Sequence, residues 1–168
     1  MDVARRSFQF ARLMRYPAAP LLVAGLLLFG AGCMTKTVVV SVPRIERLEV
    51  IDPYSPATVV EQALQDRAED YVATRPGSQA WRGKGLSMQP LLPPNAWVVT
   101  EPLPFNTLEA GQVVMFHGRH GRPVAHALVE RTRKGWVTMG VNNGNVADRN
   151  LMTPANYLGV VTTAFIVQ

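Results

Sequence analysis

The chain of 168 residues has room for one domain and an N-terminal appendage, and 48% of its residues are apolar, enough for an ordinary core. The formal net charge is +5, but four arginines and Asp2 account for +3 of it before Cys33. The remaining +2 argues against a nucleic-acid partner. Met34 to Gln168 contains no cysteine, which excludes a disulfide framework and a cysteine-based zinc site in that part.

The first 33 residues have the order of a secretory signal, in which a basic region precedes an apolar one. Arginines at positions 5, 6, 12 and 15 come before the apolar run Leu21 to Phe29. The uncharged stretch from Pro17 to Cys33 has 17 residues, fewer than the roughly 20 that a transmembrane helix needs. It ends in small residues, so residues 1–33 are predicted to be a cleavable export signal.

Gly30-Ala31-Gly32-Cys33 resembles the lipobox of bacterial lipoproteins, although Gly30 stands where a leucine is usual. In that motif the cysteine becomes the acylated first residue, and its lipid would hold the protein on a membrane. The alternative is an uncleaved, rather short membrane anchor. Both interpretations place the following domain outside the cytoplasm, in the cell envelope, and attached to a membrane.

Residues 34–80 are expected to form a tether and one amphipathic helix. Thr37 to Val42 is a β-branched run closed by Pro43, which predicts a strand or an extended tether. Ser55 and Pro56 have the order of an N-cap and a first helical residue, and they predict a helix from about Pro56 to Thr74. Its apolar face would contain four side chains: Val60, Leu64, Ala68 and Tyr71.

Residues 81–168 are predicted to form a β domain, because the breaker cluster Arg75 to Ser78 ends the helical pattern. Short β-rich runs then alternate with glycine, proline and asparagine turns. The expected strands are Trp97–Thr100, Val113–His117, Val124–Arg131, Trp136–Val141 and Gly159–Val167. The predicted fold class is therefore mainly β (α+β), with one N-terminal helix.

Ser87 is a candidate nucleophile only if a base can remove its proton. Lys134 is the one lysine after Ser87, and its place between two predicted strands suggests an exposed hairpin tip. His117 and His120 flank glycines in another predicted turn, whereas His126 lies within a strand. Histidine changes charge between about pH 5 and 8, so His126 suits proton transfer at neutral pH.

A histidine base is usually oriented by a carboxylate. Asp148 is the only aspartate after Asp70, and it lies in an Asn/Gly-rich loop after the strand that follows His126. Loops held by a sheet are common positions for functional side chains. Three glutamates remain as competitors: Glu101, Glu109 and Glu130.

Four segments occur in the order of the conserved boxes of the signal peptidase I family. Gly85-Leu86-Ser87-Met88-Gln89-Pro90-Leu91 resembles the nucleophile box, in which serine-methionine is followed after one residue by proline. Leu108 to Phe116 resembles the core strand, and Val124 to Glu130 takes the place of the strand with the base. Gly140 to Arg149 takes the place of the last box. The resemblance covers Trp81 to about Val161, nearly half the chain.

The resemblance implies a membrane-anchored serine endopeptidase that cuts extended peptide or preprotein segments, without a cofactor or a metal ion. His126, with Asp148 directly before Arg149, matches the histidine-containing endoplasmic-reticulum and archaeal-type branch rather than the lysine-containing one. The implied fold is a coiled antiparallel β structure, as in signal peptidases and self-cleaving repressors, which accepts substrate as an added strand. The catalytic residues would be Ser87, His126 and Asp148, with Met88 and Gly85 supporting the serine and the oxyanion site.

Three positions depart from the family pattern. Gln112 and Val141 stand where aspartates are usual, and Ala127 stands where arginine is common. These departures leave open a catalytically inactive lipoprotein that uses the same fold to bind a peptide or an envelope partner. Two further alternatives are a protease that cuts its own tether and a metal site of the three histidines, whose spacing is poor for ligation.

Overall fold

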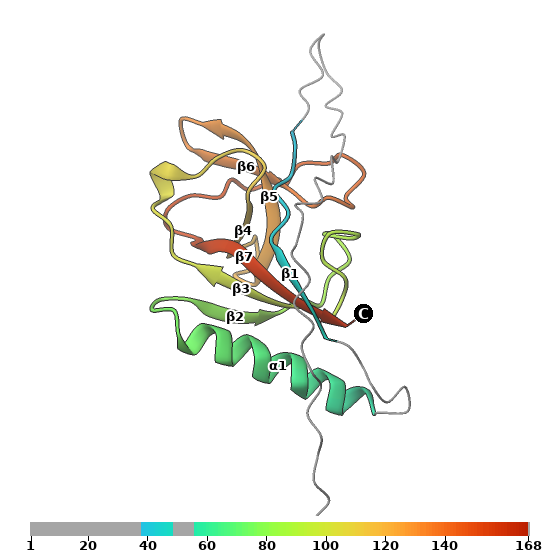
Figure 1. Cartoon of the computed structure of the whole chain (residues 1–168). Helices are drawn as coiled ribbons and strands as arrows, with labels where there is room; N and C mark the ends of the chain where they lie inside the picture. The colour runs from blue at the N-terminus through green and yellow to red at the C-terminus, as the bar shows by residue number, and fades with distance from the viewer. Residues whose placement is uncertain (1–37, 49–55, 168) are drawn as a thin grey trace, which may run out of the picture.

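The computed structural model describes residues 38–48 and 56–167, which form one seven-stranded sheet and one α-helix (Figure 1). This arrangement confirms the prediction of a mainly β fold with one helix. The elements in chain order are β1 (Arg44–Leu48), α1 (Ala57–Ala73), β2 (Gln79–Arg82), β3 (Trp97–Glu101), a short 3-10 helix η1 (Phe105–Thr107), β4 (Val113–His117), β5 (Pro123–Thr132), β6 (Gly135–Met139) and β7 (Tyr157–Val167).

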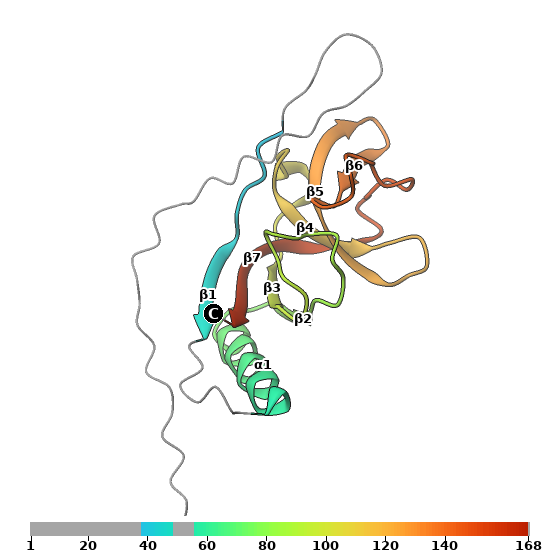
Figure 2. The same cartoon turned by 90° about the vertical axis from the view of Figure 1, so that its right-hand side faces the viewer.

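The strand order is β2-β3-β7-β4-β5-β6, and every pairing along this path is antiparallel. β1 adds a parallel pairing with residues 163–167 of β7. β3 pairs with one edge of β7, and β4 and β1 share the other edge. β4 pairs with the first half of β7, and β1 pairs with the second half of β7. Figure 2 shows β1 running beside the last part of β7.

The five predicted strands are all present, with ends that differ by a few residues. Two strands were missed. β2 has only four residues and no apolar alternation, and β1 carries three charged residues among five. Of the strand or extended tether predicted at Thr37 to Val42, the described residues 38–42 have no regular secondary structure, and the strand β1 begins after Pro43. Thr37 lies outside the described residues.

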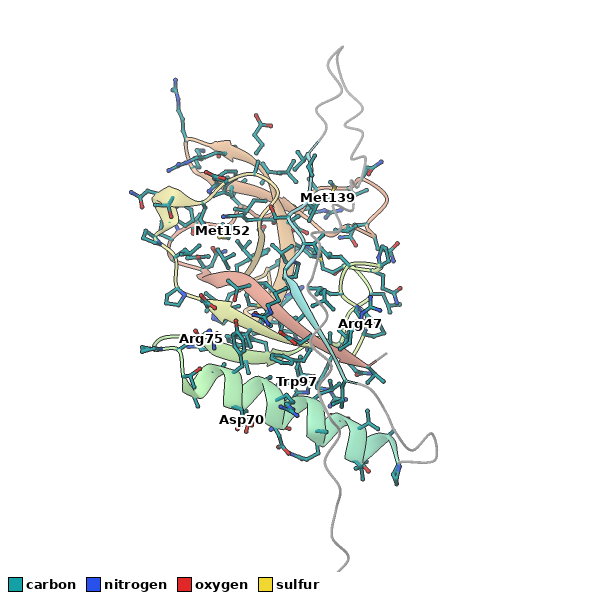
Figure 3. All side chains as sticks on the ribbon, in the orientation of Figure 1. Arg47, Asp70, Arg75, Trp97, Met139 and Met152 are labelled. Atoms are coloured by element: carbon teal, nitrogen blue, oxygen red, sulfur yellow. The ribbon has the colours of Figure 1, made fainter. Side chains whose placement is uncertain are left out.

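The helix prediction is confirmed within one residue at each end. Leu64 and Ala68 are buried against Val99 and Phe165, and the partly buried Trp97 packs there between the sheet and α1 (Figure 3). Pro56 is the N-cap residue and makes no side-chain capping bond, so the predicted cap at Ser55 is not where the helix starts. Ser55 itself lies outside the described residues.

Residues 38–42 pack into the β core although they form no strand. Val40 is 2% exposed and belongs to a cluster that includes Met88, Val113 and Ala127. The Ser41 N–H donates to the carbonyl of Gly111 at 2.7 Å. A Cβ at Gly111 would overlap the Val39 carbonyl oxygen, so glycine permits this close approach. The segment predicted as a tether is therefore part of the folded unit.

The predicted signal segment, residues 1–33, and the lipidation candidate Cys33 lie outside the described residues. Within the described ranges, no helix has the length and apolar character required to cross a bilayer.

Candidate active site

His126 is the fourth residue of β5 and is 6% exposed. It pairs in register with Val114 on β4. Its ring meets the ring of Phe116 edge to face, with the ring centroids 6.3 Å apart. Two strands and an aromatic contact thus hold the imidazole ring in one orientation. A side chain that acts as a general base needs such a fixed orientation.

Asp148 reaches His126 from the loop that follows β6. Its Oδ2 accepts a hydrogen bond from His126 Nδ1 at 2.6 Å. The same oxygen accepts from the hydroxyl of Thr138, on β6, at 2.5 Å. An ionised carboxylate can only accept, so Nδ1 carries the proton and Nε2 keeps its lone pair. The contact fixes the tautomer that a general base needs.

Ser87 lies in the loop between β2 and β3, and its Oγ is 3.0 Å from His126 Nε2. The serine hydroxyl donates to this nitrogen, because the other ring nitrogen holds the proton. The distance is within the range required of a nucleophile and its base. The three residues predicted as a Ser-His-Asp arrangement, 39 and 22 positions apart along the chain, therefore form one continuous hydrogen-bonded series.

Asn142 joins the serine loop to the loop that carries Asp148. Its backbone N–H donates to the Ser87 carbonyl at 2.7 Å, and its side-chain Nδ2 donates to the Leu86 carbonyl at 3.1 Å. Gly140 lies directly beneath this junction: a Cβ there would come within 2.7 Å of the Ser87 carbonyl oxygen. The loop between β2 and β3 and the loop that follows β6 both lie on the right-hand side of Figure 1.

Met88 and Gly85 take different places beside the serine. Met88 is 4% exposed and packs in the core with Val40 and Ala127, so it anchors the loop by burial. Gly85 lies close to Ser87: a Cβ there would be 3.9 Å from Ser87 Oγ and 4.0 Å from Ser87 N. The backbone N–H of Ser87 has no hydrogen-bond acceptor among the residues that the structure describes.

The edge of β5 beside His126 is open. β4 pairs with Pro123–Ala127 on one side, whereas β6 pairs with β5 only from Ala127 onward. Within the described ranges no strand covers Pro123–His126 on the β6 side. A separate open hollow adjoins the serine loop and is lined by Gln89, Pro90, Pro93 and Asn142.

No family model, curated protein or solved structure matches the chain. The site therefore has to be interpreted from its own geometry.

Three of the competing side chains lie elsewhere. Lys134 is exposed in the two-residue turn between β5 and β6, as predicted. Glu101 accepts from the Thr162 hydroxyl at 3.0 Å and faces Arg75. His117 Nδ1 contacts the Gly121 carbonyl at 2.9 Å in the β4–β5 turn. In the described part of the chain, no three His, Cys, Asp or Glu side chains are grouped so that they could hold a metal ion.

Three positions depart from the signal peptidase pattern, and none of their side chains is a hydrogen-bond partner of Ser87, His126 or Asp148 in the described part of the chain. Gln112 accepts from the Glu109 N–H at 3.1 Å within the turn before β4. Ala127 is fully buried in the core, where the long side chain of an arginine would not fit. Val141 is partly buried and packs against the same cluster. All three are accommodated by local packing or local hydrogen bonds.

Sequence reasoning assigned no role to Thr138 or Asn142. Thr138 is the one polar side chain in β6, and a hydroxyl in an otherwise apolar strand was the available signal. Asn142 lies within the segment that resembles the last signal peptidase box. Its contact with the serine loop depends on two loops meeting in space, and the spacing of residues along the chain does not reveal that meeting.

Proposed function

We propose that the chain is a serine endopeptidase of the signal peptidase type, which cleaves extended peptide or preprotein segments. One observation supports this above all: Ser87 Oγ lies 3.0 Å from His126 Nε2, while His126 Nδ1 lies 2.6 Å from Asp148 Oδ2. A buried histidine held between a hydroxyl and a carboxylate is the arrangement that activates serine for acyl transfer. The coiled signal-peptidase-like fold belongs to the same proposal.

The proposed reaction begins when Ser87 Oγ attacks the peptide carbonyl carbon and His126 Nε2 takes the hydroxyl proton. The oxyanion that forms accepts a hydrogen bond from the Ser87 N–H. His126 then returns the proton to the leaving amine, which departs and leaves an acyl ester on Ser87. Water, deprotonated by His126, attacks this ester and releases the new carboxyl end while Ser87 regains its proton.

The open edge of β5 supports an extended substrate rather than a folded one. A peptide strand added beside Pro123–His126 would bring its backbone next to His126, and main-chain hydrogen bonds would hold it in register. Such binding depends little on side chains, as an endopeptidase acting on varied segments requires. Attachment to a membrane through residues 1–33 or a lipid on Cys33, with the domain in the cell envelope, completes the proposal.

The test compares the full-length chain with its Ser87→Ala variant, purified with detergent. A fluorophosphonate probe is expected to label Ser87 in the wild type and nothing in the variant. A peptide containing an Ala-X-Ala site is expected to be cut at least about 10³-fold more slowly by the variant. Equal cleavage by the two proteins would reject Ser87 as nucleophile. A wild type that neither labels nor cleaves would favour the non-catalytic peptide-binding alternative.

A further inference from the structure

Thr138 is completely buried on β6, and it makes two contacts with Asp148. Its hydroxyl donates to Asp148 Oδ2 at 2.5 Å, and its backbone carbonyl accepts from the Asp148 N–H at 2.8 Å. One residue thus holds both the backbone and the carboxylate of the aspartate. The hydroxyl bond is charge-assisted, so it is among the stronger hydrogen bonds that a side chain makes.

The register of the sheet explains why Thr138 is near the histidine. Thr138 pairs with Leu128 on β5, and His126 lies two residues before Leu128. Alternate residues of a strand share a face, so Thr138 lies diagonally across from His126 on the same side of the sheet. Asp148 enters between them and bonds to both through a single oxygen.

We propose that Thr138 is a positioning residue, whose hydroxyl fixes the Asp148 carboxylate so that it orients His126 toward Ser87. The catalytic consequence of this inference rests on the proposed function, whereas the hydrogen bonds of Thr138 do not depend on that function. Asp148 lies in a loop and its side chain is 24% exposed, whereas that of His126 is 7% exposed. A carboxylate at such a site can rotate into solvent, and a buried donor on a strand opposes that rotation.

Two variants separate the hydroxyl from the space it fills. Thr138→Val keeps the branched shape and the backbone carbonyl that accepts from Asp148, and it replaces the hydroxyl by a methyl group that cannot donate. Thr138→Ser keeps the donor. In the full-length chain, Thr138→Val is expected to lower kcat for an Ala-X-Ala peptide by about 10- to 100-fold with KM nearly unchanged. Thr138→Ser is expected to stay within about 3-fold of the wild type.

A second readout does not depend on cleavage. A proton held between an imidazole nitrogen and a carboxylate gives a strongly downfield ¹H NMR resonance, and here it would report the His126 Nδ1–H bond to Asp148. The resonance is expected in the wild type and in Thr138→Ser, and it is expected to broaden or move upfield in Thr138→Val. Circular dichroism and the Tm establish that each variant is folded.

The outcomes separate the inference from the proposed function. A resonance that depends on the hydroxyl, in a wild type that cleaves nothing, supports the positioning role and counts against the peptidase. A folded Thr138→Val with the wild-type resonance overturns the inference, whatever its kcat. In a wild type that cleaves the peptide, the inference is also overturned if Thr138→Val cleaves at the wild-type rate, or if Thr138→Ser is as impaired as Thr138→Val, since packing would then explain the loss.

Discussion

At the scale of single residues, the proposed chemistry depends on the direction in which the His126 ring is held. A free imidazole exchanges its proton between two nitrogens, and only one of the two forms presents a lone pair to Ser87. Asp148 Oδ2, 2.6 Å from Nδ1, selects that form because a carboxylate accepts and does not donate. In the proposed reaction the carboxylate would also stabilise the positive charge that the ring gains when it takes the serine proton.

Replacement of the carboxylate by an amide tests this selection directly. Asp148→Asn keeps the size of the side chain but allows its NH₂ group to donate to Nδ1, which favours the wrong tautomer. We expect kcat to fall by about 10⁴-fold or less, while the Tm changes little. Steady-state kinetics on the Ala-X-Ala peptide measure the change, and Glu101→Gln is a matched control because Glu101 contacts Thr162 rather than His126. An Asp148→Asn variant with wild-type turnover would exclude an orienting role.

At the scale of elements, the loop between β6 and β7 contacts the candidate site at two places. Asp148 in this loop contacts the base, and Asn142 in the same loop holds the carbonyls of Leu86 and Ser87. His126 lies on β5 and Ser87 in the loop between β2 and β3, yet one loop contacts both segments. Movement of this loop would therefore misalign the hydroxyl and the imidazole together, and that coupling makes Gly140 a critical position.

Gly140→Ala is expected to lower both stability and the rate of probe labelling at Ser87. The added Cβ would meet the Ser87 carbonyl oxygen, so either the serine loop moves or the strand end shifts, at a cost of about 1–3 kcal/mol. Fluorophosphonate labelling rates and urea unfolding measure the two effects.

Gly144→Ala is the control in the same loop. Gly144 has φ +58°, so alanine is strained there by roughly 1 kcal/mol, but a Cβ would meet nothing within 4 Å. We expect it to lose stability and keep its labelling rate relative to the folded fraction. Equal labelling rates for the folded Gly140→Ala and Gly144→Ala proteins would show that the Ser87 loop does not depend on Gly140.

At the scale of the whole molecule, the segment before α1 completes the sheet. β1 occupies the stretch of β7 that β4 leaves uncovered, and Val40 belongs to the same core cluster as Met88, the residue after Ser87. The α1 helix covers the other end, where Tyr71 accepts a hydrogen bond from Thr163 on β7 at 3.0 Å and Arg82 on β2 pairs with Glu61. Residues near both ends of the described chain thus support the site.

Two neighbouring valines allow this support to be measured. Val40→Ala removes buried methyl groups and is expected to lower the free energy of unfolding by about 1–3 kcal/mol. Val39 is 46% exposed, so Val39→Ala is expected to change it by no more than about 0.5 kcal/mol. Urea unfolding followed by circular dichroism measures both. A Val40→Ala protein as stable as Val39→Ala would mean that residues 38–42 are only a tether.

The sequence by itself determined the helix and the five strands with clear β pattern, because a 3.6-residue period and β-branched runs between turns are short-range information. The three residues of the candidate site were predicted through the resemblance to the signal peptidase boxes, since the side chains alone left Glu101, Glu109 and Glu130 as competitors for Asp148. Only the tertiary structure placed β1 and β2, because their pairing with β7 and β3 depends on partners far away in the chain. The places of Thr138 and Asn142 also depend on the tertiary structure. The register of β6 on β5 brings Thr138 to the site, and the meeting of two loops brings Asn142 there.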